Sequence, residues 1–279
     1  MTRYFGLVVA GVLTGVIPAC TARTFEKPDV DEGPAPSVGG ATGGDSDSST
    51  GGATANRSCE GVVLAYVRDF QESHPDMERF GYNHDAYSGD VEKGIVKELL
   101  GADRKPVFNR ATPTTTTAEN FWQWYNDVDG VNIGFEVPLV FEETAPGRWR
   151  FESAAFFPAD GEGFGDWSGI DDSGIPHNYH FTLELHTVFR YDGDRDREQS
   201  FSFRGDDDVF TFINNELVVD LGGVHEAEEQ VVNVHERLPD LVPGQTYPLD
   251  FFFAERHVTQ SNFKIETSLA LERCDIIIK

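Results

Sequence analysis

The feature that most constrains the fold is a succession of strand-like segments from Val131 to Glu272. Gly, Pro, Asp and Asn clusters separate these segments, which is typical of strands joined by turns. Asn214 and Asn215 predict a tight hairpin between two of them. We therefore predict a mainly β protein, an antiparallel β-sandwich with one or two short helices. The sequence lacks the strand-helix alternation of parallel sheets. The predicted strands lie within 131–141, 148–157, 179–191, 199–204, 209–214, 216–221, 229–238, 246–255 and 261–272.

Two helices are expected before these strands. The first runs from Asp90 to Leu100 and stops at a glycine. The second begins where Thr116 and Glu119 stand in the spacing of a capping box, ahead of the aromatic segment 121–125. Such aromatic side chains could stack on a sugar, but they more often pack in a core.

The N-terminal 20 residues have the pattern of an export signal, with an early arginine, a short apolar run and small residues before Cys20. This ending resembles a bacterial lipoprotein processing site, so we predict that Cys20 is lipidated in the cell envelope, at the outer membrane or cell surface. Ordinary signal-peptidase cleavage and secretion is the alternative. Residues 21–58 are rich in Gly, Ser and Thr and predict a disordered tether. Residues 59–279 form the predicted folded domain.

Three cysteines occur in the chain. If Cys20 carries lipid, Cys59 and Cys274 remain as a pair that flanks the folded region. An exported protein meets an oxidising compartment, so we predict a disulfide between them. Two unpaired buried thiols are the alternative.

The formal net charge is -26 and the sequence pI is near 4.5. Nucleic-acid binding needs clustered Lys and Arg, so it is not expected. Cations and neutral ligands remain plausible partners, although a solubilising acidic surface explains the composition alone.

An acidic run, Asp206 to Asp208, stands in a short turn between two predicted strands. Adjacent carboxylates repel one another, so the run requires solvent exposure or a positive partner. A hard divalent cation such as Ca²⁺ is the obvious candidate.

Two other groups of side chains resemble metal-binding motifs in their residue types or spacing. Asp192, Asp194 and Asp196 have the spacing of an EF-hand start, but Arg197 and Phe203 occupy the positions that require Gly and Glu. A solvated loop is therefore expected there.

His177, His180 and His186 could suggest zinc, but strand alternation separates the first from the other two. We expect structural roles for them. Residues 255–257, Glu-Arg-His, are expected to form a structural ion pair, with one another or with the acidic run.

Several motifs together resemble the fibro-slime domain family of bacterial and slime-mould surface proteins. That family is related to the β-sandwich of protective antigen, which yeast flocculins and some glucosidases also carry. The resemblance covers nearly the whole folded region. The motifs are VRDF at 67–70, HPD at 74–76, FWQWY at 121–125, HNYHFTLELHTVFRY at 177–191, GDDDVFTFIN at 205–214, LVVDLGGVH at 217–225 and FFFAERHVTQSNFKIETSL at 251–269.

The resemblance implies that Asp206 and Asp207 bind calcium, joined by a cis peptide that turns both carboxylates to one side. It also implies Asn262 as a ligand from a second loop. Asp208 then lies at the rim of the site, and His225 could contact the ligand from the loop after a double glycine. A hydrogen-bonded loop histidine is an equal alternative for His225.

We therefore expect an exported module that binds calcium and carbohydrate, in adhesion or in an extracellular matrix, with a surface or matrix polysaccharide as partner. A purely structural, calcium-stabilised surface module is one alternative. A glycan-processing enzyme is another, but the sequence has no G-x-S-x-G elbow, H-E-x-x-H helix or phosphate-binding glycine loop.

Overall fold

The computed structural model describes residues 59, 61–78, 89–165, 169–171, 173–258, 260–276 and 278. The predicted signal peptide, the predicted tether and Cys20 lie outside these residues. No helix in the described ranges is long and apolar enough to cross a membrane.

The larger of two main sheets has seven strands, and every pair in it is antiparallel. Two strands share one edge of β7, because β1 pairs with its first half and β14 with its second half. In order, the strands are β10 (Glu216–Leu221), β9 (Asp208–Ile213), β12 (Thr246–Glu255), β7 (Phe181–Arg190), β1 (Val62–Phe70) and β2 (Asn132–Val140), with β14 (Ala270–Ile276) beside β7.

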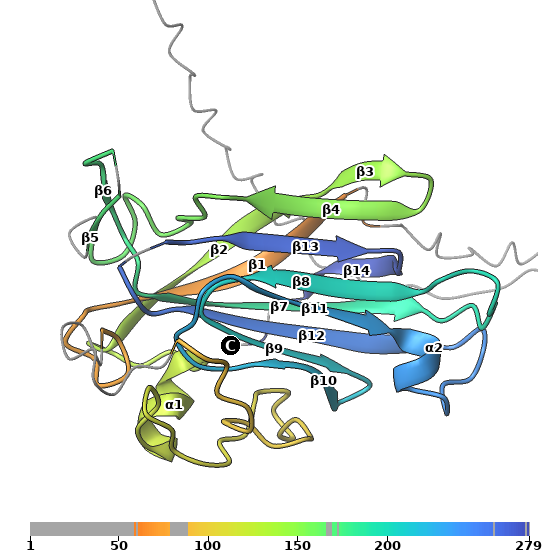
Figure 1. The fold of residues 1–279 in the computed structure, drawn as a ribbon, viewed down its shortest axis with the longest axis horizontal. Coiled ribbons are helices and arrows are strands. Elements are labelled where there is room, and N and C mark those ends of the chain that lie inside the picture. Colours follow the sequence, from red (N-terminus) through yellow and green to blue (C-terminus); the bar gives the residue numbers. More distant parts are fainter. Residues whose placement is uncertain are drawn as a thin grey trace, which may run out of the picture. The chain divides into compact units, whose positions relative to one another are not determined.

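The second main sheet has five antiparallel strands and faces the first, so the predicted sandwich is confirmed (Figure 1). A separate two-stranded ribbon joins β5 (Gly169–Ile170) to β6 (Pro176–His177). In order, the strands of the second sheet are β11 (Glu228–Asn233), β8 (Ser200–Gly205), β13 (Phe263–Thr267), β4 (Arg148–Ser153) and β3 (Glu142–Ala145).

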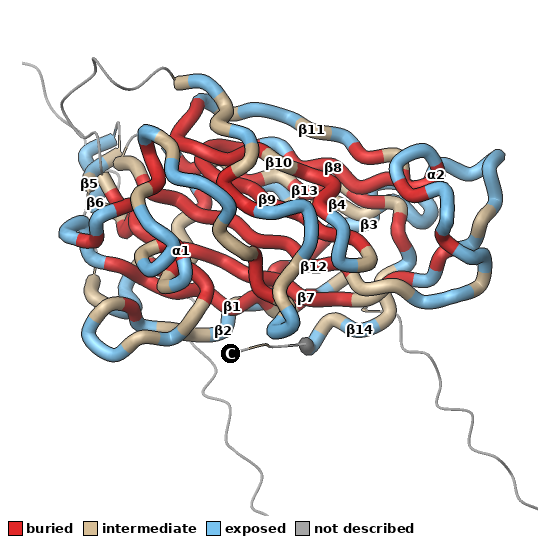
Figure 2. The backbone as a smooth tube through the Cα atoms, turned by 90° about the horizontal axis from the view of Figure 1, so that it is seen from below, coloured by how far each residue is buried: buried red, intermediate tan, exposed pale blue. Residues whose placement is uncertain are grey.

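Strand β12 is buried on both faces, which explains its run of three phenylalanines. Phe251 and Phe253 point into the core between the two sheets, whereas Phe252 joins a second apolar cluster on the outer face of the larger sheet. Successive side chains of a strand point to opposite faces, so a strand covered on both sides loses the usual apolar-polar alternation. Figure 2 shows β7 and β12 buried along most of their length.

The second cluster exists because residues 91–128 form a third layer over β9, β10 and β12 (Figures 1 and 2). This layer contains α1 (Ala118–Trp124), the helix predicted from the aromatic segment. Phe121, Trp124 and Tyr125 are buried, so most of the aromatic patch belongs to the core, whereas Trp122 is 53% exposed. The N-cap is Thr117, whose side chain accepts a hydrogen bond from the amide of Asn120.

The helix predicted over 90–100 is wrong. Gly94 has φ of 80°, which interrupts a helix. The backbone of this segment bonds to distant segments instead: the Glu92 amide donates to the Gly222 carbonyl and the Leu100 amide to that of Asn215. Burial of Ile95 in the second cluster replaces the amphipathic helical face that the sequence pattern suggested.

Only the first half of the predicted strand 229–238 forms a strand, which ends at Asn233. It is continued by α2 (Val234–Arg237), because the side chain of Asn233 caps the amides of His235 and Glu236. The predicted hairpin is confirmed: Asn214 and Asn215 have φ of 52° and 67°, as a two-residue β-turn of this kind requires.

A network of buried ion pairs connects the third layer to the larger sheet. Glu184 on β7 accepts hydrogen bonds from Lys105 Nζ at 2.7 and 2.6 Å and from Arg68 Nη1 at 2.8 Å. His186 lies between Glu184 and Asp250, 3.2 Å and 2.6 Å away. Lys105 belongs to the covering segment, so its charge reaches a carboxylate of the sheet beneath.

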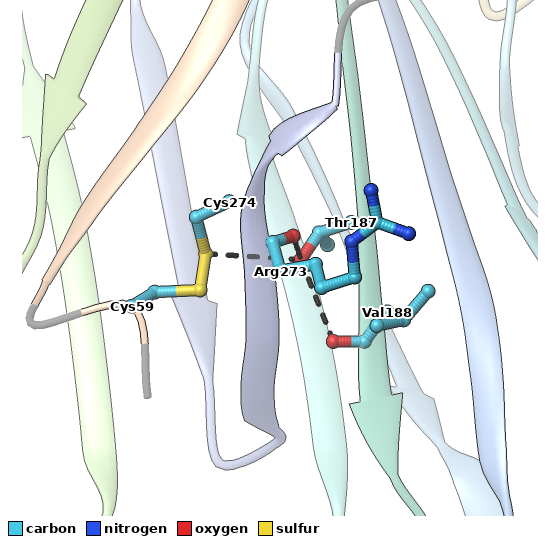
Figure 3. The surroundings of a disulfide bond; sticks show 5 residues. All are labelled: Cys59, Thr187, Val188, Arg273 and Cys274. Atoms are coloured by element: carbon cyan, nitrogen blue, oxygen red, sulfur yellow. Dashed lines mark hydrogen bonds between the residues drawn. A yellow bond between two sulfur atoms is a disulfide. The ribbon is translucent and has the colours of Figure 1, made fainter. Parts of the chain in front are cut away.

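The predicted disulfide is present. Cys59 and Cys274 are 215 positions apart, and their Cα atoms are separated by 5.5 Å, a normal span for this bond (Figure 3). The bond attaches the segment before β1 to β14. Closing a loop of this length could stabilise the fold by about 5 kcal/mol on the chain-entropy account.

Candidate functional site

The acidic run lies where the chain passes from one sheet to the other. Strand β8 of the second sheet ends at Gly205, and β9 of the larger sheet begins at Asp208. Asp206 and Asp207 therefore form a two-residue crossing at one end of the sandwich. The end of β12 and the start of β13 meet the same end, because Ala254 pairs with Asp208 and Phe263 pairs with Gly205.

Asp206 and Asn262 are brought together as the sequence predicts. The Asn262 backbone amide donates to Asp206 Oδ1 at 2.6 Å, and its side-chain Nδ2 donates to Oδ2 at 2.7 Å. The side chain of Asn262 therefore binds the carboxylate through its nitrogen, and Oδ1 is the atom that it could offer to a cation. Asp206 itself is only 5% exposed.

Asp207 has an unusual backbone and an unusual pKa. Its φ is 20°, a value rare for residues with a side chain. No cis peptide bond occurs in the described ranges, so the cis peptide expected between Asp206 and Asp207 is not found. Burial raises the pKa of Asp207 to about 8, against the lowering effect of Arg256, whose backbone amide donates to Oδ2 at 2.9 Å.

Asp208 forms a fully buried ion pair with Arg256. The guanidinium Nε and Nη2 lie 2.6 and 2.5 Å from Asp208 Oδ2, while the Gly223 amide donates to Oδ1 at 2.6 Å. The Asp208 side chain is fully buried, and its charge is compensated by the guanidinium of Arg256. This geometry matches the structural ion pair expected at 255–257 and does not favour a ligand contact by Asp208.

Arg256 also ties the site to the third layer. Its Nη1 donates to the carbonyl oxygens of Asp76 and Thr114 at 3.0 and 2.6 Å, and its guanidinium carbon lies 4.6 Å from the centre of the Trp124 ring. Asp76 in turn accepts hydrogen bonds from the Trp124 indole and the Thr116 amide. Segments far apart in sequence thus fix the conformation of the acidic turn.

Glu255 is a site residue that the sequence did not single out as a ligand. It ends β12, is 1% exposed, and its Oε2 has no hydrogen-bond partner in the part of the chain that the structure describes. Burial, and then the charges of Asp207 and Asp206, raise its pKa well above the usual value. Three carboxyl groups therefore share one poorly solvated region, and each opposes ionisation of the others.

His225 is placed beside the ion pair but not at the surface. It is 2% exposed, and its Nδ1 lies 2.7 Å from the Glu226 carbonyl oxygen. Its Nε2 lies 3.4 Å from the Leu221 carbonyl oxygen. This is the geometry of a hydrogen-bonded loop histidine, the alternative to a ligand contact.

The remaining candidate metal residues lie elsewhere. His180 contacts Glu78 and His186 contacts Glu184 and Asp250, so both belong to internal ionic networks. The Asp192–Asp196 loop is largely exposed, and its aspartates accept hydrogen bonds from their own backbone. Across the described ranges, no group of three or more His, Cys, Asp or Glu side chains is arranged to hold a metal ion by itself.

The donor set of the acidic turn nevertheless suits a hard cation that also uses other oxygens. Asp206, Asp207 and Glu255 supply carboxylates, and Asn262 supplies an amide oxygen, all of the type that calcium prefers. The unpartnered Glu255 Oε2 and the raised pKa values mark a place where added positive charge would relieve repulsion.

Comparisons with solved structures give weak matches. The PA14 domain of MpAFP antifreeze protein aligns with 47% of this chain and 74% of that chain, with 8% identity and a TM-score of 0.27. A PA14 sugar-binding domain from an RTX adhesin aligns with 46% and 80%, with 12% identity and a TM-score of 0.24. Scores this low support no conclusion about fold or ligand.

Sequence relatives are much more similar. Protein psiR of Dictyostelium discoideum is 40% identical over 225 residues, which cover 76% of this chain and 21% of psiR. Protein psiQ of the same organism is 40% identical over 193 residues, 66% of this chain and 19% of psiQ. This chain thus spans about a fifth of the length of these relatives. Residues 155–279, which carry the acidic turn and Asn262, match the PA14 domain.

Proposed function

We propose that the chain is an exported module that binds calcium and, through it, carbohydrate, and that it acts in adhesion or in an extracellular matrix. Its partner would be a surface or matrix polysaccharide. The observation that carries the proposal is the convergence of Asp206, Asp207 and Glu255 at one end of the sandwich. Neighbouring buried carboxyls either take up protons, as the raised pKa values of Asp207 and Glu255 indicate, or bind a cation that compensates their charge.

In this proposal Asp206 and Asp207 hold the ion with their carboxylates and Asn262 offers Oδ1, while Glu255 adds negative charge nearby. Calcium takes six to eight oxygen ligands. Backbone carbonyls, water and sugar hydroxyls would complete that number, since no group of three His, Cys, Asp or Glu side chains in the described ranges could hold a metal ion. The bound ion would supply coordination positions for the hydroxyl groups of a sugar.

The carbohydrate part of the proposal is supported by the match of residues 155–279 to the PA14 domain, a module of the carbohydrate-binding and adhesion type. The sequence resemblance to fibro-slime domains points to the same biology. We propose no catalytic activity for the chain, in keeping with a binding module.

A glycan array probed with the labelled full chain, in calcium and in chelator, tests this function. We expect a set of glycans that bind in calcium, are lost in chelator, and are also lost in Asp206→Asn when calcium is present. Asp240→Asn, which changes an exposed aspartate outside the site, is the matched control and should bind like the wild type. If no glycan loses binding both in chelator and in Asp206→Asn, the calcium-dependent mechanism is wrong.

A structural role for calcium is the second candidate. The specific observation in its favour is burial: Asp206 and Asp207 are only 5% and 3% exposed, which leaves little surface for a sugar. Under this alternative, calcium raises the melting temperature of the wild type and not of Asp206→Asn, while no glycan binds in a calcium-dependent way.

We further propose that Cys20 carries the lipid that anchors the protein at the cell envelope. Metabolic labelling with a clickable fatty acid, followed by membrane fractionation, tests this proposal. Label and membrane association should both be lost in Cys20→Ser. Secretion of unlabelled wild-type protein would instead support ordinary cleavage.

A further inference from the structure

A second candidate binding site lies at the opposite end of the sandwich. A cleft of about 840 Å³ is lined by residues at the starts of β1, β4 and β14, at the end of β7 and in the loop before β8. Strand β13 connects the two ends: Asn262 precedes it and Ser268, which lines the cleft, follows it. Six residue steps of about 3.3 Å place the cleft roughly 20 Å from the acidic turn. Its volume is in the range of about 300 to 1,000 Å³ that small-molecule sites occupy.

The floor of the cleft is apolar and closed. Val63, Phe141 and Leu271 line it, and the same three residues border a void of only about 10 Å³ that continues between the sheets. A space of this size holds one water molecule at most. The floor therefore stops a flexible acyl chain from entering the core and favours a short, rigid ligand with an apolar face.

Trp149 supplies an aromatic wall. It is half-buried on β4, opposite Thr267 of β13, and is held at close range by the chain before β1. A Cβ atom on Gly61 would lie 3.0 Å from the Trp149 ring and 2.8 Å from the Phe141 carbonyl oxygen, so only glycine allows this approach. The ring is thus positioned by the fold while part of it remains accessible.

The rim is polar and electrically balanced. Three positive and three negative side chains line it, in a chain with a net charge of -26: Arg148, Arg190, Arg197, Asp192, Asp196 and Glu198. Arg148 Nη2 lies 3.0 Å from Glu198 Oε2, and about half of each side chain is exposed. A balanced rim offers both donors and acceptors and gives no advantage to an ion of either sign.

We propose that this cleft binds a neutral sugar ring, with the apolar face of the ring on Trp149 and its hydroxyl groups on the charged rim. The C–H face of a pyranose can pack on an indole surface, and arginine and carboxylate side chains supply donors and acceptors for its hydroxyl groups. None of the residues that carry this site belongs to the acidic turn. Binding here is therefore independent of calcium.

Saturation-transfer NMR on the full chain in chelator tests the site. The probes are glucose, galactose, mannose, N-acetylglucosamine and the β-linked disaccharides cellobiose and laminaribiose, with octanoate as an acyl-chain probe. We expect transfer to at least one neutral sugar and none to octanoate. Transfer to octanoate alone, or to no sugar, would overturn the proposal.

Two variants locate the binding. Trp149→Ala should abolish the transfer, and Ala270→Trp should do the same by filling the cleft from β14, where Ala270 is exposed. Trp122→Ala, at an exposed tryptophan of α1, and Asp207→Asn should leave the transfer unchanged. If Trp149→Ala unfolds, as its melting curve would show, Ala270→Trp still decides. Sugar binding in chelator that survives Ala270→Trp places the ligand elsewhere and contradicts the inference.

The same variants separate this site from the proposed calcium function. Loss of calcium-dependent glycan binding in Asp207→Asn, with calcium-independent binding retained, assigns one ligand to each end. If the wild type binds sugar in chelator but shows no additional glycan binding in calcium, the proposed function of the acidic turn is wrong. The proposed sugar site in the cleft is then still supported.

Discussion

Arg256 and Asp208 form a fully buried ion pair, with Nε and Nη2 of the guanidinium 2.6 and 2.5 Å from the same carboxylate oxygen. The pair joins the end of β12 to the first residue of β9. It also orients the backbone amide of Arg256 toward Asp207, and so helps to place the acidic turn.

Replacing Arg256 should be strongly destabilising. Arg256→Met leaves the Asp208 charge buried without its partner, which costs about 3 to 5 kcal/mol in the free energy of unfolding. Arg148→Met removes an exposed pair and should cost no more than about 1 kcal/mol. Urea denaturation measures both. Adding Asp208→Asn to Arg256→Met should recover part of the loss, and equal effects of the two single variants would refute this role.

Glu184 should make stability depend on pH in the acidic range. Burial alone would raise its pKa, but the hydrogen bond with His186 and the charges of Arg68 and Lys105 hold the pKa below its usual value. The folded state therefore binds the proton more weakly than the unfolded state. The contribution of Glu184 is complete above the unfolded pKa of about 4.3 and is lost as pH falls through the folded pKa.

Glu184→Gln measures that contribution. At neutral pH the variant should lose about 3 kcal/mol, because three buried donors keep only a neutral partner. The difference in unfolding free energy from the wild type should shrink as pH falls below about 4. A difference that stays constant across that range would contradict the assigned ion pairs.

Reduction of the disulfide should destabilise the domain without changing its fold. Loss of the bond between Cys59 and Cys274 is expected to cost about 2 to 5 kcal/mol. Thermal melting with and without a reductant measures the effect. The double variant Cys59→Ser, Cys274→Ser should melt at the temperature of the reduced wild type, and reductant should not change its melting temperature. If reductant does not change the melting temperature of the wild type either, the disulfide adds no stability.

Much of the fold could be predicted because the strand signal is local. The Asn214–Asn215 hairpin and the alternating segments around it specify strands without help from distant residues. The helix expected at 90–100 failed because its backbone hydrogen bonds go to Gly222 and Asn215, partners that a local pattern does not reveal. Asn233 as an N-cap was a local signal for α2 that the strand pattern obscured.

The candidate site was predictable only in part. Asp206 and Asn262 are 56 positions apart, and family resemblance, rather than spacing, suggested that they meet. The contact of Arg256 with the Asp76 carbonyl joins residues 180 positions apart, so no sequence period could indicate it. Glu255 lies at the end of a buried strand, and its nearness to the aspartates emerges only from the pairing of β12 with β9.

The central claim is that Asp206 and Asp207 bind calcium. Isothermal titration of the chelator-treated full chain with calcium, with melting curves on the same samples, tests it most directly. We predict one bound ion per chain and stabilisation by about 2.7 kcal/mol when calcium exceeds its Kd a hundredfold. Both effects should disappear in Asp207→Asn and persist in Asp240→Asn. Calcium binding and stabilisation that survive Asp207→Asn, or a wild type that binds no calcium, would contradict the account.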